Sequence, residues 1–364
     1  YGFDVFSAVK DGGFRKCLKD AVVKESKVIG CLEPFTIGEG AQLWRLSYDT
    51  GVWELIVDSD EEFSFRGFRS MIVYKGRIYV SAAFGGFGFG DSYFLLSSAD
   101  GVTWDREHDG PQNNGIVPRA MTVYQDKLYI GTEIALSSIG VIKPELWSFD
   151  GTTWSQIPDL PFTKSRGVGA LLVHDDKLWI GIIGETSRDS SFGLYTFDGT
   201  SFDGTVAPDL TTYTAWDGVQ YDLGAIGSDN LGIGSMISYN GRLWMGIANI
   251  VNGFSVLVSD GSGAGWELVT ANGMGNPANA YSWQFLEFEG RFLIGTFNLG
   301  IVSIFVSGPS IPTNVFDSPG EGELWSLSLK EDKKFESIRL PADWAASSYG
   351  IRTMKTCFNG ARMC

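Results

Sequence analysis

The sequence contains little of what builds the common metal, catalytic and nucleic-acid sites. It has only two histidines among 364 residues, His108 and His174, and no Cys-x-x-Cys pair, so neither a zinc site nor a histidine-based catalytic set is expected. No basic run offsets the formal net charge of −15, which argues against nucleic acid as a partner because acidic surfaces repel phosphate. No apolar stretch approaches the roughly 18 residues that a transmembrane helix needs. Segments with the periodicity of amphipathic helices are nearly absent.

Cysteine is also scarce, and the four cysteines lie near the two ends of the chain. We expect two local disulfides, Cys17–Cys31 and Cys357–Cys364. Cross-terminal bridges are the alternative pairing, and reduced buried thiols are the alternative state. The chain begins at Tyr1 without Met and without a signal-like apolar segment, a start typical of a mature, exported product. A secreted or cell-surface location is therefore expected.

What the sequence does contain is a repeated phrase of twelve residues. The phrase appears as "VYKGRIYVSAAF" (73–84), "VYQDKLYIGTEI" (123–134) and "VHDDKLWIGIIG" (173–184). Each copy holds two runs of β-forming residues around a polar pair, and such pairs tolerate the positive φ of a two-residue hairpin turn. The phrase therefore predicts a β-hairpin. Further copies have their turns at 240–241, 289–290 and 359–360, and "VVKESKVIGC" (22–31) is a weaker copy.

A third run and a fourth run with an aromatic residue follow most hairpins, as in "ELWSFDGTTWSQI" (145–157). Repeated units of four antiparallel strands and about 50 residues are typical of a β-propeller, whose sheets bury both faces against their neighbours. We predict one all-β propeller domain over 1–364. Its seven blades are 13–57, 66–107, 118–158, 166–204, 232–270, 281–340, and 348–364 completed by 1–9. Pairing of the N- and C-terminal strands closes the predicted ring. Six blades is the alternative count.

The repeats also carry a resemblance to known propellers. The "SxDGxTW" segments resemble shortened Asp-box turns of sialidase-type propellers, and "NGRLWMGI" with "VLVSDG" and "WELV" is similar to secreted microbial propellers with kelch-like repeats. The resemblance covers nearly the whole chain and implies the architecture. As evidence of activity it is weak, because the repeated residues build blades and not sites.

Four arginines share one position when the predicted first strands are aligned. The segments "GFRKC", "GFRSM", "PRAM" and "GIRTM" contribute Arg15, Arg69, Arg119 and Arg352, and Trp283 holds the same position in another blade. A guanidinium binds carboxylate or phosphate in a bidentate manner, so these residues predict a site for an anionic ligand at the channel mouth. A belt of salt bridges with acidic residues of the neighbouring blade is the alternative.

Long segments after the second and fourth strands are expected on one face of the propeller, which makes that face the predicted ligand surface. They are 81–92, 132–144, 182–192, 204–231 and 297–322. Residues 205–230 combine aromatic and acidic side chains, which suits sugar recognition or calcium, with ordinary packing as the alternative. Ca²⁺ is thus a candidate ligand.

These features favour a non-catalytic extracellular or cell-surface module that binds a glycan or a protein, and they favour a non-enzyme over an enzyme. One alternative is a glycan-active hydrolase or lyase of sialidase-like type that uses the arginines for an anionic substrate. That resemblance implies a tyrosine nucleophile and an acidic proton donor, and Glu133 and Glu185 are candidate acids. The other alternative is a self-assembling filament or layer subunit that exchanges terminal strands.

Overall fold

The structure is a computed structural model of the chain. It describes residues 17–24, 27–33, 42–47, 50, 52–58, 67–83, 95–107, 109–111, 116–134, 143–163, 165–184, 193–204, 212–222, 230–260, 265–299, 322–328, 334–338, 354, 356–357 and 362–363. The chain forms two compact units: unit 1 is Tyr1–Pro158 with Thr353–Cys364, and unit 2 is Asp159–Arg352. None of the helices in the described part has the length and apolarity to span a lipid bilayer.

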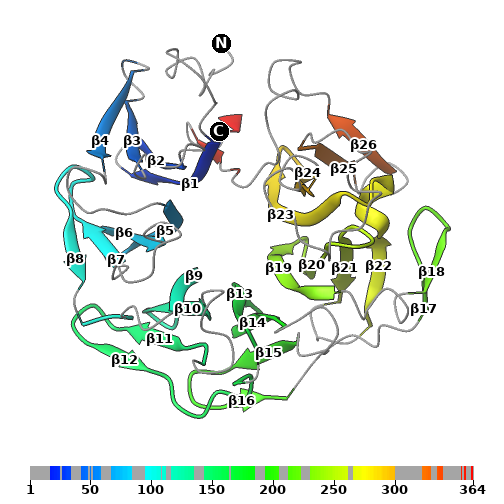
Figure 1. Cartoon of the computed structure of the whole chain (residues 1–364), viewed down its shortest axis with the longest axis horizontal. Coiled ribbons are helices and arrows are strands. Elements are labelled where there is room, and N and C mark those ends of the chain that lie inside the picture. The colour runs from blue at the N-terminus through cyan, green and yellow to red at the C-terminus, as the bar shows by residue number, and fades with distance from the viewer. Residues whose placement is uncertain are drawn as a thin grey trace. The chain divides into compact units, whose positions relative to one another are not determined.

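Unit 1 contains three sets of four antiparallel strands that pair in chain order (Figure 1). The first set is β1 (Cys17–Lys24), β2 (Lys27–Glu33), β3 (Gln42–Ser47) and β4 (Trp53–Asp58). The second is β5 (Gly67–Tyr74), β6 (Arg77–Ala83), β7 (Leu95–Ser98) and β8 (Asp105–Glu107). The third is β9 (Ile116–Tyr124), β10 (Lys127–Ile134), β11 (Leu146–Phe149) and β12 (Trp154–Gln156). A short pair, β27 (Thr356–Cys357) and β28 (Arg362–Met363), completes the described part of this unit.

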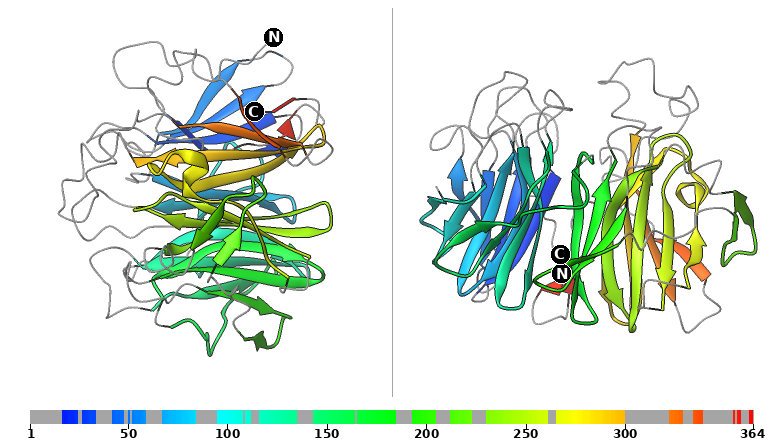
Figure 2. Two further views of the ribbon diagram at one scale, coloured as in Figure 1. Left: turned by 90° about the vertical axis from the view of Figure 1, so that its right-hand side faces the viewer. Right: turned by 90° about the horizontal axis from the view of Figure 1, so that it is seen from below.

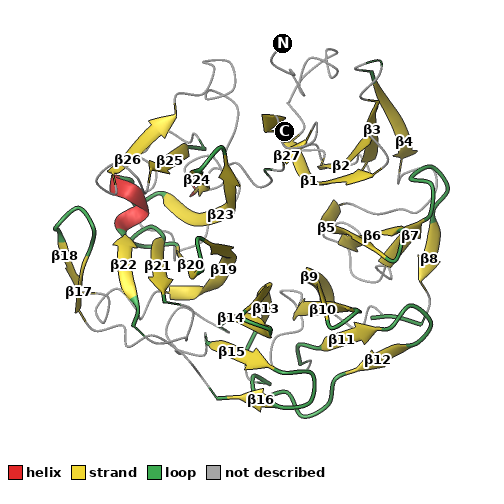
Figure 3. Cartoon of the chain, turned by 180° about the vertical axis from the view of Figure 1, so that it is seen from behind, coloured by secondary structure: helices red, strands yellow, loops and turns green. Residues whose placement is uncertain are grey.

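Unit 2 has the same construction (Figure 3). Its first set is β13 (Gly167–His174), β14 (Lys177–Ile183), β15 (Leu194–Phe197) and β16 (Phe202–Asp203). The second is β19 (Asn230–Tyr239), β20 (Arg242–Asn249), β21 (Ser255–Ser259) and β22 (Glu267–Thr270). The third is β23 (Asn279–Phe288), β24 (Arg291–Asn298), β25 (Leu324–Ser328) and β26 (Lys334–Ile338). A hairpin of β17 (Thr212–Thr214) and β18 (Gln220–Asp222) and the 3₁₀ turn η2 (Asn272–Gly275) are additions to this plan.

The two-residue turns between first and second strands confirm the predicted hairpins. Both central residues have positive φ in each described turn: Lys75-Gly76, Gln125-Asp126, Asp175-Asp176, Asn240-Gly241 and Glu289-Gly290. This geometry matches the twist of the flanking strands, whereas the common turns with negative φ splay them apart. The polar pairs of the repeated phrase therefore fix where the first strand of each sheet ends and the second begins.

Within each unit, consecutive sheets pack face to face. One core cluster joins Leu43 of β3 and Val57 of β4 to Phe68, Ile78 and Leu96 of the following sheet. First strands of consecutive sheets are neighbours: β1 beside β5, β5 beside β9, β13 beside β19 and β19 beside β23. The right-hand view of Figure 2 shows the strands of unit 1 (blue to green-cyan) roughly side by side. The described residues thus form six sets of four antiparallel strands, as the predicted all-β fold requires, and the number of blades stays a prediction. The seventh blade and the closure stay predictions, because residues 1–9 lie outside the described part.

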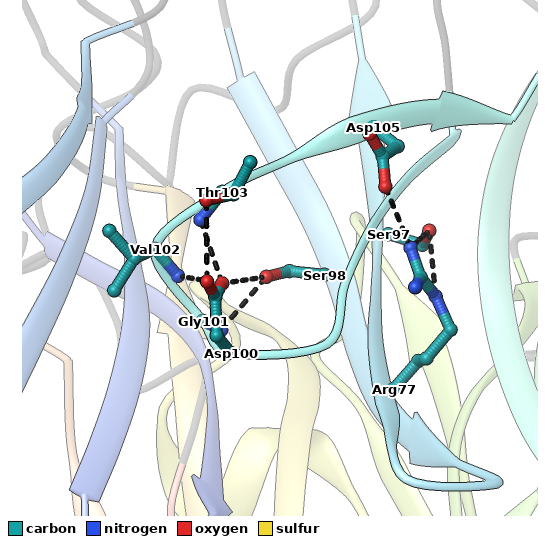
Figure 4. Close-up of polar contacts among 8 residues, drawn as sticks. All are labelled: Arg77, Ser97, Ser98, Asp100, Gly101, Val102, Thr103 and Asp105. Atoms are coloured by element: carbon teal, nitrogen blue, oxygen red, sulfur yellow. Dashed lines mark hydrogen bonds and ion pairs between the residues drawn. The ribbon is translucent and has the colours of Figure 1, made fainter.

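The aspartates of the "SxDGxT" segments stabilise the turns between third and fourth strands, and Figure 4 shows the turn at Asp100. The Asp100 Oδ1 accepts hydrogen bonds from the backbone N–H groups of Val102 and Thr103, each at 2.8 Å. Asp150 accepts from Thr152 and Thr153, and Asp198 accepts from Thr200 and Ser201, in the same way. The repeated Asp therefore closes the turn between the third and fourth strands.

These turns make acid stability depend on three exposed carboxylates. The N–H groups of Thr103 and Val102 lower the pKa of Asp100, and the Thr152 hydroxyl with the N–H groups of Thr153 and Thr152 lowers that of Asp150 to about 2, from an ordinary 3.8. The pKa of Asp198 is lowered by the same kind of hydrogen bonds. A lowered folded-state pKa stabilises the fold above the unfolded pKa, and the contribution disappears as the pH falls through the folded value.

We therefore expect the triple variant Asp100→Ala, Asp150→Ala, Asp198→Ala to have a lower melting temperature than the wild type above pH 3.8. The difference should narrow as the pH falls from 3.8 towards 2. Differential scanning calorimetry over that range measures it. A difference that stays constant down to the lowest pH would show that the hydrogen bonds of these turns do not depend on ionised carboxylates.

A cross-strand ladder explains the basic residue that follows several of the hairpin turns. The Arg77 Nη2 on β6 donates to the Ser97 hydroxyl on β7 and lies 2.9 Å from the Asp105 carboxylate on β8 (Figure 4). Arg242 and Arg291 make the corresponding ion pairs with Glu267 and Glu336. Each ion pair is solvent-accessible, so the ladder contributes to register more than to stability.

The cysteines of the first hairpin are not directly opposite one another, contrary to the alignment from sequence. In the β1–β2 register Cys17 faces Glu33 and Cys31 faces Asp20. The alignment of "GFRKC" with "GFRSM" makes Cys17 the equivalent of Met71 in the second sheet. In the structure the equivalent of Met71 is Ala21, four residues later, because Lys24 pairs with Lys27 as Tyr74 pairs with Arg77. In β27–β28 Cys357 faces Arg362, so Cys357 and Cys364 are also offset. The two disulfides stay predictions, because these four side chains lie outside the described residues.

Candidate functional site

Every first strand carries a β-bulge at the same place, which we call the bulge position. It lies eight residues before the start of the second strand (69 to 77, 119 to 127). Six residues occupy it: Lys19, Arg69, Arg119, Gly169, Gly234 and Trp283. A bulge leaves one residue out of the ladder and re-aims its side chain, and such bulges are frequent beside functional sites.

The bulge position confirms part of the predicted arginine alignment and corrects one member. Arg69, Arg119 and Trp283 stand there as the alignment predicts. In the first sheet the position belongs to Lys19 and not to Arg15, because the pairing of Lys24 with Lys27 sets the register four residues later than the "GFRKC" match suggests. Arg15 and Arg352 lie outside the described residues.

Arg69 and Arg119 meet on one buried carboxylate in unit 1. The Nη1 atoms of both guanidinium groups lie 2.5 Å from the same Oε2 of Glu133. The Glu133 side chain is 4% exposed, whereas the arginine side chains are 16% and 18% exposed. We call these three residues the Arg69–Glu133–Arg119 cluster. The Arg69–Glu133 contact joins neighbouring sheets, as in the predicted alternative of a salt bridge, and the site for an anionic ligand stays a prediction.

The end of β10 is fixed so that Glu133 reaches both arginines. The Thr132 hydroxyl accepts a hydrogen bond from the Glu145 N–H at 2.7 Å, and the Thr132 N–H donates to the Glu145 carbonyl oxygen at 3.0 Å. These bonds hold β10 against the segment that leads into β11. Glu133 follows Thr132 directly, so its backbone is held in place by the sheet rather than by a loop.

Glu133 stands at a place where most of the described second strands carry an uncharged residue, although β2 has Glu33 there. It stands six residues after the start of its second strand. Four other sheets carry an uncharged residue at this place: Ala83, Ile183, Ala248 and Phe297. Sequence reasoning selected Glu133 as a candidate acid, but it missed the pairing with Arg69, since that contact joins residues 64 apart in the chain.

In unit 2 the bulge position supports aromatic packing instead of charge. The Trp283 ring stacks on Phe297 with centroids 4.2 Å apart and planes 33° apart, and Trp283 is half-buried. In the segment 205–230, Trp216 donates to the Glu267 carboxylate and packs edge-on against Trp244. The described aromatic residues of that segment therefore take the predicted alternative, ordinary packing against the sheet.

Several other candidates find structural explanations or lie outside the described part. The His174 ring is buried in β13 with its Nδ1 2.8 Å from the Ser238 hydroxyl oxygen, as suits the predicted strand residue. Burial raises the pKa of Tyr79 to about 12 and raises that of Tyr129, so neither is an activated nucleophile. Glu185 lies outside the described residues. Within the described residues no group of three or more His, Cys, Asp or Glu side chains is arranged to hold a metal ion.

Comparison with known proteins establishes the fold. No protein-family model matches the sequence, and no curated protein matches it. The chain is similar to a GH74 xyloglucanase from Xanthomonas campestris, with 13% identity and a TM-score of 0.55 over 90% of this chain and 45% of that one. It is also similar to a prolyl endopeptidase, with 11% identity and a TM-score of 0.50 over 90% of this chain and 43% of that one. The chain spans less than half the length of either, and the likeness confirms the β-propeller fold.

These relatives correct the expectation of a non-catalytic binding or assembly module. The two solved structures named above, a xyloglucanase and a prolyl endopeptidase, are enzymes, so the preference for a binding module and for a non-enzyme was wrong. The preference for a non-enzyme failed because it treated the lack of a catalytic motif in the sequence as a sign that the protein has no activity. Blade residues repeat and are visible in one sequence, whereas site residues on a propeller come singly from different blades.

Proposed function

We propose that the protein is a glycan-active hydrolase that binds an anionic group of its substrate at the Arg69–Glu133–Arg119 cluster. The observation that supports this most is the pair of guanidinium groups on adjacent first strands, both partly exposed and both held by one buried carboxylate. Two such groups side by side suit a sugar carboxylate, because planar guanidinium groups bind carboxylates with two parallel hydrogen bonds. The fold shared with a xyloglucanase supports the reaction class.

In this proposal Arg69 and Arg119 bind the substrate, and Glu133 is a positioning residue. Two guanidinium groups on one carboxylate oxygen favour its ionised form, which is the wrong form for a proton donor. Hydrolysis of a glycosidic bond needs an acid and a second carboxylate. Glu185 stays the candidate for one of these two carboxylates.

The finer predictions from the sequence fit this function. Secretion to the cell surface or beyond gives a glycan hydrolase access to its polymer, and the Asp100, Asp150 and Asp198 turns support the proposed kinship with Asp-box and kelch-like propellers.

Substitution of the two arginines tests the proposal. We expect Arg69→Ala and Arg119→Ala each to lower kcat/KM on an acidic oligosaccharide about 100-fold, since each removes a charge-assisted contact worth up to about 3 kcal/mol. Arg69→Lys should recover only part of the activity because it keeps the charge and loses the planar fork. Release of reducing sugar from a panel of acidic and neutral glycans is the measurement, with circular dichroism as the check of folding.

Arg45→Ala is the matched control, because Arg45 pairs with Glu54 on the exposed part of the first sheet. Its activity should equal that of the wild type. The same assay separates a hydrolase from a lyase, since a lyase leaves an unsaturated product that absorbs ultraviolet light. Full activity of the folded Arg69→Ala variant on acidic glycans would refute the proposed site.

A further inference from the structure

Asn-Gly pairs recur in unit 2, and their chemistry allows the chain to modify itself. The backbone nitrogen of the glycine attacks the side-chain amide carbon of the asparagine, since glycine has no side chain to shield that nitrogen. Three such pairs lie within the described residues of this unit: Asn240-Gly241, Asn252-Gly253 and Asn272-Gly273. Asn114-Gly115 and Asn359-Gly360 lie outside the described part of the chain. By sequence alone these pairs are equivalent, so the structure must distinguish them.

Asn240-Gly241 is the open pair. It forms the hairpin turn between β19 and β20 (Figure 1), and both of its residues are exposed. The φ angles are 53° for Asn240 and 69° for Gly241. Apart from the chain neighbours of Gly241, no described atom lies within 4 Å of the place that a Cβ atom on this glycine would take. The glycine therefore faces open space, and its exposed asparagine has room to react.

Asn272-Gly273 is closed, because hydrogen bonds hold its glycine on both sides. The Gly273 N–H is the group that would attack, and it donates to the Phe254 carbonyl oxygen at 3.0 Å. The Gly273 carbonyl oxygen accepts from the Asn279 side-chain amide, also at 3.0 Å, and Gly273 is buried. Attack on Asn272 requires this nitrogen to lose its proton and turn, which breaks a hydrogen bond inside the protein.

Asn252-Gly253 is closed by the same segment. Gly253 is buried, and a Cβ atom on it would lie 2.6 Å from the backbone nitrogen of Gly273. The Asn252 N–H donates to the side-chain oxygen of Asn249 at 2.8 Å. Backbone packed this closely and bonded in this way lacks the freedom to close a ring.

We propose that Asn240 is a site of spontaneous deamidation in the native protein, and that Asn252 and Asn272 are protected. The Gly241 nitrogen bonds to the Cγ of Asn240, the Cγ–Nδ2 bond breaks, and ammonia leaves with the proton of the Gly241 N–H. Water then opens the cyclic succinimide at either of its carbonyl carbons, which gives aspartate or isoaspartate. Both products add one negative charge to the turn. The proposal does not depend on the proposed hydrolase activity.

The two products differ in their effect on the sheet. Aspartate fits the turn, since Asp175 and Asp176 adopt positive φ in the corresponding turn of the preceding sheet. Isoaspartate carries the main chain through Cβ, so the two-residue turn gains a backbone atom and loses the geometry that matches its strands. Tyr239 precedes the turn, and its hydroxyl donates to the Gly290 carbonyl oxygen of the next sheet at 3.2 Å. A displaced turn therefore also weakens a contact between two sheets.

Peptide mapping by mass spectrometry tests the proposed site. The purified chain is incubated at mildly alkaline pH, once native and once unfolded in urea. In the native chain we expect exchange of amide for carboxylate at Asn240 and none at Asn252 or Asn272, whereas in urea all three should react at similar rates. Asn240→Gln should abolish the modification, because glutamine must close a larger ring. Gln125 holds the corresponding turn position with a φ of 45°, so this variant keeps the turn.

Melting of the modified protein tests the effect on the sheet. The isoaspartyl form is separated by ion exchange and identified with an isoaspartyl methyltransferase and a labelled methyl donor. It should melt at a lower temperature than the wild type, whereas Asn240→Asp, which adds the charge without the extra backbone atom, should melt like the wild type. Equal melting of the isoaspartyl form and Asn240→Asp would overturn the effect on the turn.

The mapping has three outcomes that would overturn the proposal. An unmodified Asn240 in the native chain refutes the site. Reaction of Asn252 or Asn272 as fast as Asn240 in the native chain refutes the protection. Failure of Asn252 and Asn272 to react in urea shows that their local sequence protects them and the fold does not.

Discussion

Glu133→Gln should lower the free energy of unfolding by about 3 kcal/mol, the low end of the range for breaking a buried ion pair. The substitution keeps the shape of the side chain but leaves two guanidinium groups together without their carboxylate. The cost stays at the low end because both arginine side chains keep some exposure, 16% and 18%, and because the amide oxygen still accepts a hydrogen bond. Urea denaturation followed by tryptophan fluorescence measures the change.

Sulfate distinguishes the charge effect from a loss of packing. With the carboxylate gone, an added oxyanion can take its place between Arg69 and Arg119, so sulfate should stabilise Glu133→Gln more than it stabilises the wild type at equal ionic strength in chloride. The control is Glu54→Gln, in the exposed pair with Arg45, for which a change of about 0–1 kcal/mol is expected. Equal sulfate effects on wild type and Glu133→Gln would contradict the assignment of this cluster as an anion site.

The positioning role also predicts how Glu133→Gln changes catalysis. Loss of guanidinium orientation should raise KM for the acidic substrate more than it lowers kcat, because Glu133 holds the binding groups and does not touch the reacting atoms. A proton donor would give the opposite pattern, a collapse of kcat and of one limb of the pH profile. Steady-state kinetics as a function of pH therefore separate the two roles.

The blades could be predicted from the sequence because their signals are local and repeated. Polar pairs such as Asn240-Gly241 mark hairpin turns through their positive φ, and the turn sets the register of both strands. The predicted register was wrong in the first sheet, where it was based on the match of "GFRKC" with "GFRSM". That choice moved Arg15 into the place of Lys19 and set Cys17 against the wrong partner.

The site could be predicted only in part, for a physical reason. Arg69 and Arg119 were found because they share a repeated position, but their common partner Glu133 lies in the neighbouring sheet for one of them and in the same sheet for the other. Such a contact depends on how consecutive sheets pack, which no single stretch of sequence encodes. The preference for a binding module failed likewise, because the repeats build the fold and carry no information about activity.

Gly169→Ala should destabilise unit 2 by about 3 kcal/mol or more, as overpacking against backbone does. A Cβ atom at this bulge position would lie 2.1 Å from the Ile233 carbonyl oxygen and 2.9 Å from the Ile183 Cγ1. The backbones approach this closely because β14 and β19 join there, with Ile183 paired to Gly232. The Gly184 N–H also donates to the Leu231 carbonyl oxygen at 2.7 Å, so the first of these sheets cannot move away without breaking the junction.

Gly234→Ala is the matched control, because Gly234 holds the same bulge position one sheet later and the nearest atom to its Cβ, the Tyr281 Cδ1, is 3.7 Å away. That is ordinary van der Waals distance, so a change within about 0.5 kcal/mol is expected. Chemical denaturation of the two variants compares one substitution at one register position in two packing environments. If Gly169→Ala is as stable as Gly234→Ala, the junction of β14 and β19 is looser than its hydrogen bonds indicate. A large difference shows that glycine is required at the bulge position only where two sheets merge, which leaves the other bulge positions open to charged and aromatic residues.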